Sequence, residues 1–97
     1  MIVDGYDIKL PSLEDVENSE NPLIVARLYN FHGNGEWYVL GGEKLSNGDY
    51  YLFGYVKGLI EDELGFFTIH QLIKNNIKND SNWKPIGLYD KFPELRR

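Results

Sequence analysis

The sequence predicts an α+β fold, an antiparallel β-meander of four to five strands with one main helix packed on one face. Short runs rich in β-branched and aromatic residues alternate with turns that contain glycine. Sequential strands joined by such short turns pair antiparallel. A later stretch instead carries apolar residues at helical spacing. Ninety-seven residues without a linker or an internal repeat predict a single domain, residues 1–97.

Three strands are expected in the first part of the chain. They cover residues 23–31, 37–42 and 50–56. The turns between them, "HGNGE" and "EKLSNGD", contain glycines that can adopt positive φ, and Asn47-Gly48 is a strong turn signal. Gly54 lies inside the third strand, where a glycine indicates a bulge or the close approach of another backbone.

A short fourth strand is expected at residues 66–67, followed by a helix that begins at Thr68. Thr68 and Gln71 have the spacing of a capping box. The apolar residues that fall near one face of this helix are Ile69, Leu72, Ile73 and Ile77. Residues 83–92 are expected to be a last extended segment. Residues 1–22 are expected to be an irregular lead-in, in which Ser12 with Asp15 could begin a short helix.

The charge distribution is uneven. Residues 1–49 carry nine acidic and three basic residues, a net charge of −6, whereas residues 50–97 carry six acidic and seven basic residues, a net charge of +1. An acidic protein repels the phosphate backbone, so direct binding of nucleic acid is not expected. A basic surface on a protein partner, such as the nucleic-acid channel of an enzyme, would be attracted. Mild acidity also serves solubility alone.

The sequence contains no recognisable catalytic pattern. The absence of cysteine excludes disulfides, thiolate metal sites and thiol catalysis. His32 and His70 come without a nucleophile or metal-ligand spacing, and no phosphate-binding loop is found. The acidic run at residues 61–63 lacks the alternate ligand spacing of a calcium loop. No cofactor, metal or catalytic residue is therefore predicted.

Nine residues are the candidates for binding a partner. They are Glu36, Glu43 and Asp49 near the turns, Glu61, Asp62 and Glu63 in the acidic run, and Tyr51, Phe53 and Tyr55 in the third strand. Strand alternation places those three aromatic side chains on one face. That face either is open, and offers area to a partner, or is covered by the termini. An RNA-binding sheet would need basic residues, and only Arg27 and Lys57 are near.

Several short motifs carry a resemblance to a known family. They are Leu10-Pro11, Trp37-Tyr38, Gly48-Asp49 before "LFGYV", and Gly58-Leu59 before "ELGFF". Together they resemble a bacterial family catalogued as domain of unknown function number 2958, over roughly residues 9–92. The sequence departs from the family's Ser-x-Leu pattern at residues 68–71, and the C-terminal strand matches weakly. The resemblance implies no catalytic residues, but a small accessory protein of a plasmid, phage or integrated element.

These observations favour a non-enzymatic binding protein of a phage or mobile element. By analogy with other small acidic proteins of such elements, it would occupy a basic surface on a host defence nuclease, in the manner of an anti-CRISPR protein. One alternative is a small hydrolase or ligand-binding enzyme that uses a His–carboxylate pair. Another is a structural subunit of a conjugation or replication complex. No apolar run is long enough for a membrane span and no secretory signal is recognised, so a cytoplasmic location is expected.

Overall fold

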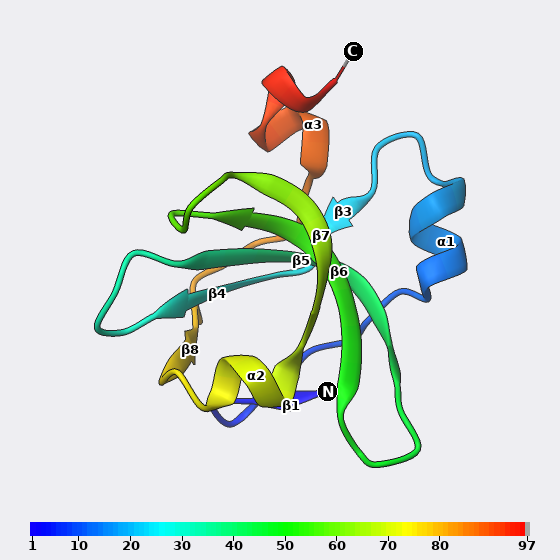
Figure 1. Cartoon of the computed structure of the whole chain (residues 1–97). Helices are drawn as coiled ribbons and strands as arrows, with labels where there is room; N and C mark the ends of the chain where they lie inside the picture. Colours follow the sequence, from blue (N-terminus) through cyan, green and yellow to red (C-terminus); the bar gives the residue numbers. More distant parts are fainter. Residues whose placement is uncertain (97) are drawn as a thin grey trace.

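The computed structural model describes residues 1–96 and has the predicted α+β class (Figure 1). A five-stranded antiparallel sheet with the strand order β7-β6-β5-β4-β8 forms its centre, and two small two-stranded sheets, β1-β2 and β3-β9, flank it. The strands are β1 (Ile2–Val3), β2 (Tyr6–Asp7), β3 (Leu23–Ile24), β4 (Ala26–Asn30), β5 (Glu36–Lys44), β6 (Tyr50–Lys57), β7 (Glu63–Thr68), β8 (Ile77–Asn79) and β9 (Ile86–Gly87). The helices are α1 (Leu13–Asn18), α2 (Ile69–Ile73), α3 (Leu88–Lys91) and the 3₁₀ turn η1 (Pro93–Leu95).

Strands β4 to β7 form the predicted meander, because each pairs with the next along the chain. The fifth strand, β8, pairs with β4, so the chain crosses from one edge of the sheet to the other through α2. This crossing leaves β7 as the outermost strand on its side.

The bulge indicated by Gly54 lies in the neighbouring strand. The register shifts between Val39 and Gly41, so Leu40 is the additional residue on β5. Gly54 pairs with Val39, and a Cβ at Gly54 would collide with the carbonyl oxygen of Tyr38. Glycine is required there because the two backbones approach closely.

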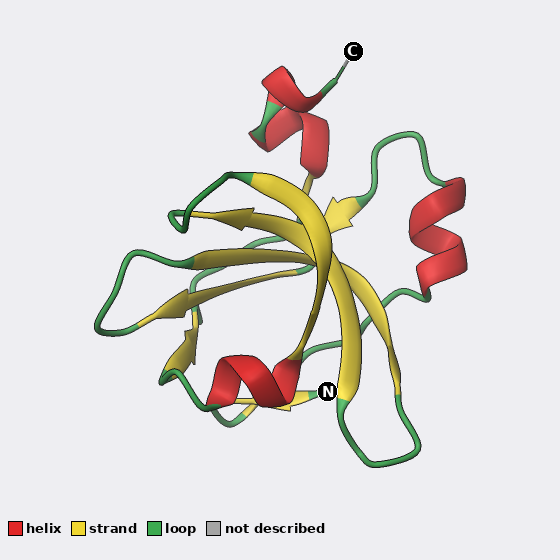
Figure 2. Cartoon of the chain, viewed as in Figure 1, coloured by secondary structure: helices red, strands yellow, loops and turns green. Residues whose placement is uncertain are grey.

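Each face of the sheet carries its own hydrophobic cluster. The first cluster packs the N-terminal hairpin and α2 onto one face, and its buried members are Val3, Ile8, Ala26, Leu28, Trp37, Val39, Leu52, Phe67, Ile69, Leu72 and Ile77. The second packs α1, α3 and η1 onto the other face, and its buried members are Val16, Ile24, Tyr38, Leu40, Tyr55, Leu88 and Phe92. Figure 2 shows α2 below the sheet, α1 to the right of the sheet and α3 above it.

Several predictions of local structure were wrong. Three short helices take the place of one main helix. Helix α2 ends at Ile73 because Asn76 adopts a left-handed φ of 57°, which suits the end of a helix, and Ile77 then begins β8. The expected strand 23–31 is divided at Val25, since β3 pairs with β9 and β4 with β5.

The two ends of the chain are more ordered than predicted. Residues 1–22 contain the β1–β2 hairpin, whose turn uses positive φ at Asp4 and Gly5, and the helix α1. Ser12 caps α1, since its hydroxyl accepts a hydrogen bond from the N–H of Asp15 at 3.1 Å. Residues 83–92 contain β9 and α3 rather than one strand. No helix in residues 1–96 has the length and apolar character needed to span a membrane.

Candidate functional site

The aromatic face of β6 is covered at one end and open at the other. Tyr51, Phe53 and Tyr55 share this face, as alternation predicts. Tyr55 is only 4 % exposed, because Phe92 packs edge-on against its ring at 4.8 Å. Phe66 of β7 stacks on Tyr51 at 4.8 Å and contacts Phe53 at 4.8 Å, yet Phe66 remains 55 % exposed. Tyr51, Phe53 and Phe66 are therefore the accessible part of the aromatic surface.

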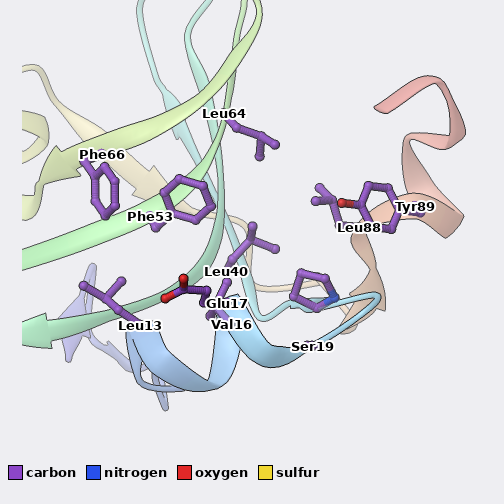
Figure 3. A pocket seen from close by; sticks show the side chains of 11 residues that line it. Leu13, Val16, Glu17, Ser19, Leu40, Phe53, Leu64, Phe66, Leu88 and Tyr89 are labelled. Carbon is purple, nitrogen blue, oxygen red and sulfur yellow. The ribbon is translucent and has the colours of Figure 1, made fainter. Parts of the chain in front are cut away.

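An open groove of about 470 Å³ borders this aromatic surface (Figure 3). Leu40 and Phe53 of the sheet line it, with Leu64 and Phe66 of β7 on one side. Helices α1 and α3 line its other sides. Its lining is mainly apolar. An apolar side chain of a partner could therefore displace water from the groove with a gain in free energy.

The acidic run lies at the start of the same edge strand. Glu61, Asp62 and Glu63 are all exposed. The Asp62 carboxylate is partly occupied, since it accepts a hydrogen bond from the N–H of Gly58 at 3.0 Å and lies 3.9 Å from the Lys57 ammonium. Asp62 therefore helps to hold the loop between β6 and β7.

A second hollow, of about 480 Å³, lies on the opposite face of β7. Glu61 and Glu63 line it together with Leu59 and Ile60, and Ile60 is completely exposed. Apolar and acidic groups thus lie side by side at the tip of the β6–β7 loop. Such a mixture is typical of surfaces that bind protein.

Glu36 is held inside an intramolecular network. Its Oε1 accepts hydrogen bonds from Arg27 Nη2 at 2.6 Å, from Arg27 Nε at 3.0 Å and from the Tyr38 hydroxyl at 3.0 Å. Arg27 also donates to Asp80 at 3.3 Å. Because these contacts occupy the carboxylate, Glu36 stabilises the β4–β5 pair and offers little charge to a partner.

Glu43 and Asp49 lie at the other end of the β5–β6 pair, roughly 20 Å along the strand from Glu36 at the usual rise per residue. Glu43 is exposed and lies opposite Tyr51, so it borders the aromatic surface. Asp49 is 7 % exposed. The predicted acidic residues therefore do not form one patch: Glu43 lies opposite Tyr51, whereas Glu61 and Glu63 line a hollow with Phe66 on the other face of β7.

The buried Asp49 caps α2. Its Oδ1 accepts hydrogen bonds from the N–H groups of Tyr50 at 2.6 Å and His70 at 3.0 Å. Burial would raise the pKa of this carboxyl group, but the hydrogen bonds from His70 and Tyr50 outweigh it and lower the pKa below its ordinary value. Asp49 is thus charged at neutral pH and satisfies amides at the start of the helix.

The described residues contain one His–carboxylate pair, in which Nδ1 of His70 lies 3.5 Å from Oδ2 of Asp49. Neither residue lines the two hollows beside β7. In the described residues the Thr68 side chain takes part in the capping box of α2 with Gln71, whereas an activated nucleophile needs its base adjacent. Within residues 1–96, no group of three or more His, Asp or Glu side chains is placed to hold a metal ion.

The principal residues that the sequence interpretation missed are Leu64 and Phe66. The expected fourth strand covered residues 66–67 only, whereas β7 runs from Glu63 to Thr68. The available signal was the aromatic and β-branched run "FFT" with Leu64 before it.

Comparisons of the chain with protein-family models, with curated proteins and with solved structures give no match. The resemblance to family 2958 stays a prediction from the sequence.

Proposed function

We propose that the chain is a non-enzymatic binding protein that attaches to a basic surface of a partner protein. The binding region is the β6–β7 edge, defined as Tyr51, Phe53, Glu61, Glu63, Leu64 and Phe66. One observation carries the proposal: at the β7 edge of the sheet, the exposed side chains of Ile60 and Phe66 line one hollow together with the exposed carboxylates of Glu61 and Glu63. Buried aromatic anchors supply most of the affinity in protein interfaces.

The carboxylates in this proposal provide attraction and orientation. Charges at the margin of an interface mainly raise the association rate and exclude wrong partners. A net charge of −5 strengthens the long-range attraction to a basic surface and makes it sensitive to salt.

The partner class that fits this chemistry is a protein with a nucleic-acid channel. We further propose that it is a defence nuclease of the bacterial host and that the chain acts in the cytoplasm as an accessory protein of a phage or mobile element. The support is the acidic charge of the chain together with the resemblance to family 2958. Occupying the channel would exclude DNA or RNA by competition.

Affinity capture tests the proposed function. The tagged protein is incubated with a lysate of a bacterium that carries CRISPR and restriction systems, with and without nuclease treatment. The expected result is a partner with a basic channel that resists nuclease treatment, dissociates at high salt and loses its cleavage activity when the protein is added. Capture of only the chain itself would favour a structural subunit, and turnover in a ligand screen would favour an enzyme.

A charge-reversal variant links the captured partner to the acidic residues. Glu61→Lys with Glu63→Lys removes both free carboxylates and keeps Asp62, which holds the loop. The matched control reverses Glu20 and Glu94, which are also exposed and lie outside β6 and β7. Equal binding by both variants would show that net charge, and not the β6–β7 edge, attracts the partner.

A further inference from the structure

Strand β7 has an unpaired edge. It is the outermost strand of the sheet, and no backbone hydrogen bond in residues 1–96 joins Leu64 or Phe66 to a segment outside the sheet. A free edge presents N–H and C=O groups that can pair with another extended chain.

The register shows which backbone groups point outward. At the β5–β6 turn, the N–H of Leu45 donates to the carbonyl of Asp49 at 2.8 Å, so Asp49 faces β5. Antiparallel hydrogen bonding alternates along a strand, so odd-numbered residues of β6 face β5 and even-numbered residues face β7. Gly54 is even-numbered and pairs with Gly65, so Gly65 faces β6. The N–H and C=O groups of Leu64 and Phe66 consequently face away from the sheet.

The edge lacks the features that usually prevent pairing. Natural edge strands carry lysine, proline or a bulge, and "ELGFFT" contains no lysine or proline and pairs with β6 in continuous register. Gly65 lies at its centre, and a Cβ there would meet no atom within 4 Å. No packing in the described residues requires this glycine, and a glycine inside a strand often marks the approach of another backbone.

The two sides of β7 have different chemistry. The side chains of Leu64 and Phe66 border the apolar groove. Glu63 points to the opposite side, where it lines the second hollow with Glu61. A strand added next to β7 would place alternate side chains on these two sides. Its complementary sequence has apolar residues on the groove side and basic residues on the side of Glu61 and Glu63.

We infer that the partner docks by adding an extended segment of alternating apolar and basic residues to the edge of β7. Backbone hydrogen bonds to Leu64 and Phe66 supply affinity, and the alternating side chains supply specificity. This inference rests on the proposed function, because it names the segment by which the partner is recognised. A second copy of the chain fits less well, since two copies each carry a net charge of −5.

A synthetic peptide in which valine and lysine alternate is the probe. Backbone amide exchange is followed by NMR on the full chain, with and without the peptide. In the free protein, Gly65 and Phe67 should be protected, whereas Leu64 and Phe66 should exchange rapidly. At a peptide concentration of about ten times its Kd, exchange at Leu64 and Phe66 should slow by about tenfold, because each amide then exchanges only from the small free fraction of the protein. A matched peptide with glutamate in place of lysine should give no protection.

Two variants separate backbone pairing from side-chain contact. Leu64→Pro removes an outward N–H and leaves the bonds to β6, a placement that edge strands tolerate. It should weaken peptide binding by about tenfold relative to Leu64→Ala, which keeps the N–H. Equal binding by the two variants, or peptide-induced protection at another surface, would overturn the inference. Thermal unfolding confirms that each variant is folded, and the exchange experiment on the unchanged chain needs no variant.

The outcomes distinguish this inference from the proposed function. A partner captured from lysate that binds Leu64→Pro and Leu64→Ala equally well leaves the proposed function intact and removes the edge as the docking site. Peptide protection at Leu64 and Phe66 without any captured partner leaves the edge intact and removes the proposed function. A dimer could also be found by sedimentation, with the Leu64 and Phe66 amides protected before any peptide is added. This result would show that a second copy of the chain pairs with the edge, and it would overturn the inference.

Discussion

The carboxylate of Asp49 accepts a hydrogen bond from the backbone N–H of His70 at 3.0 Å, across 21 positions of sequence. It joins the β5–β6 turn to the start of α2, which itself follows β7. This contact helps to fix the end of β7 that carries Phe66. Asp49 therefore helps to hold in place the strand that carries the binding edge.

Asp49→Asn and Asp49→Ala should both lower the melting temperature. Alanine removes both acceptor oxygens and leaves the amides of Tyr50 and His70 without this partner. Asparagine retains one uncharged acceptor, so its effect should be smaller. Circular dichroism during heating measures the melting temperatures, which should fall from the unchanged chain to Asp49→Asn and further to Asp49→Ala. A variant Asp49→Ala as stable as the unchanged chain would contradict the capping role.

The stabilisation by Asp49 should depend on pH. Its folded pKa lies below the unfolded value of about 3.9, because hydrogen bonds from His70 and Tyr50 outweigh the effect of burial. The stabilisation is therefore complete above that value and is lost as pH falls through the folded pKa. The difference in melting temperature between the unchanged chain and Asp49→Asn should be constant above about pH 5 and shrink below about pH 4. A constant difference down to low pH would contradict this account.

Two glycines that face each other across β6 and β7 should respond oppositely to substitution. Gly54→Ala places a Cβ against the carbonyl oxygen of Tyr38 and should cost about 2 kcal/mol or more in the free energy of unfolding. Gly65→Ala meets no atom within 4 Å and should be neutral or stabilise by about 0.5 kcal/mol through the unfolded state. Urea unfolding of the two variants measures both values. Similar losses would show that Gly65 has a packing role in the folded chain.

Glu36→Gln should affect stability rather than partner binding. The substitution weakens the hydrogen bonds from Arg27, of which the shortest is 2.6 Å. Both side chains are partly exposed, so the expected cost is only about 1 kcal/mol. Partner affinity should stay unchanged, since Glu36 lies outside the β6–β7 edge. Urea unfolding and affinity measurement on the same sample test the two statements separately.

Phe92→Ala should uncover Tyr55. Burial raises the pKa of the Tyr55 hydroxyl, an effect that nearby Lys57 reduces. Removing the Phe92 ring should return that pKa toward about 10 and cost about 3 kcal/mol of stability. Spectroscopic titration of the tyrosines, with the unchanged chain as control, measures the shift. An unchanged titration curve would mean that other groups bury Tyr55.

The sequence predicts the meander because alternation and turn chemistry act locally. Runs such as "YYLFGYV" specify both the strand and the face of each side chain, and alternate side chains of β6 do pack into the two different hydrophobic clusters. The end of α2 was harder to predict. Ile77 continues the helical spacing of apolar residues, although the left-handed Asn76 ends the helical conformation before it. Local signals therefore identified the elements better than their boundaries.

The site depended on contacts that alternation cannot supply. Tyr55 and Tyr51 have the same spacing and face, yet Phe92, far along the chain, covers one and not the other. Arg27 likewise occupies Glu36, whereas Glu61 and Glu63 are exposed beside β7. The accessible candidates are therefore set by Phe92, which lies between α3 and η1, and by Arg27 of β4, and the position of Phe92 depends on packing between distant segments.

The salt dependence of partner affinity tests the central claim most directly. The affinity of the captured partner is measured over a range of salt concentration for the unchanged chain, for the variant with Glu61→Lys and Glu63→Lys, and for the control reversed at Glu20 and Glu94. We expect the first variant to bind at least about tenfold more weakly at low salt and to lose most of the salt dependence, and the control to lose much less. Equal curves for the unchanged chain and the first variant would contradict an acidic docking edge at β7.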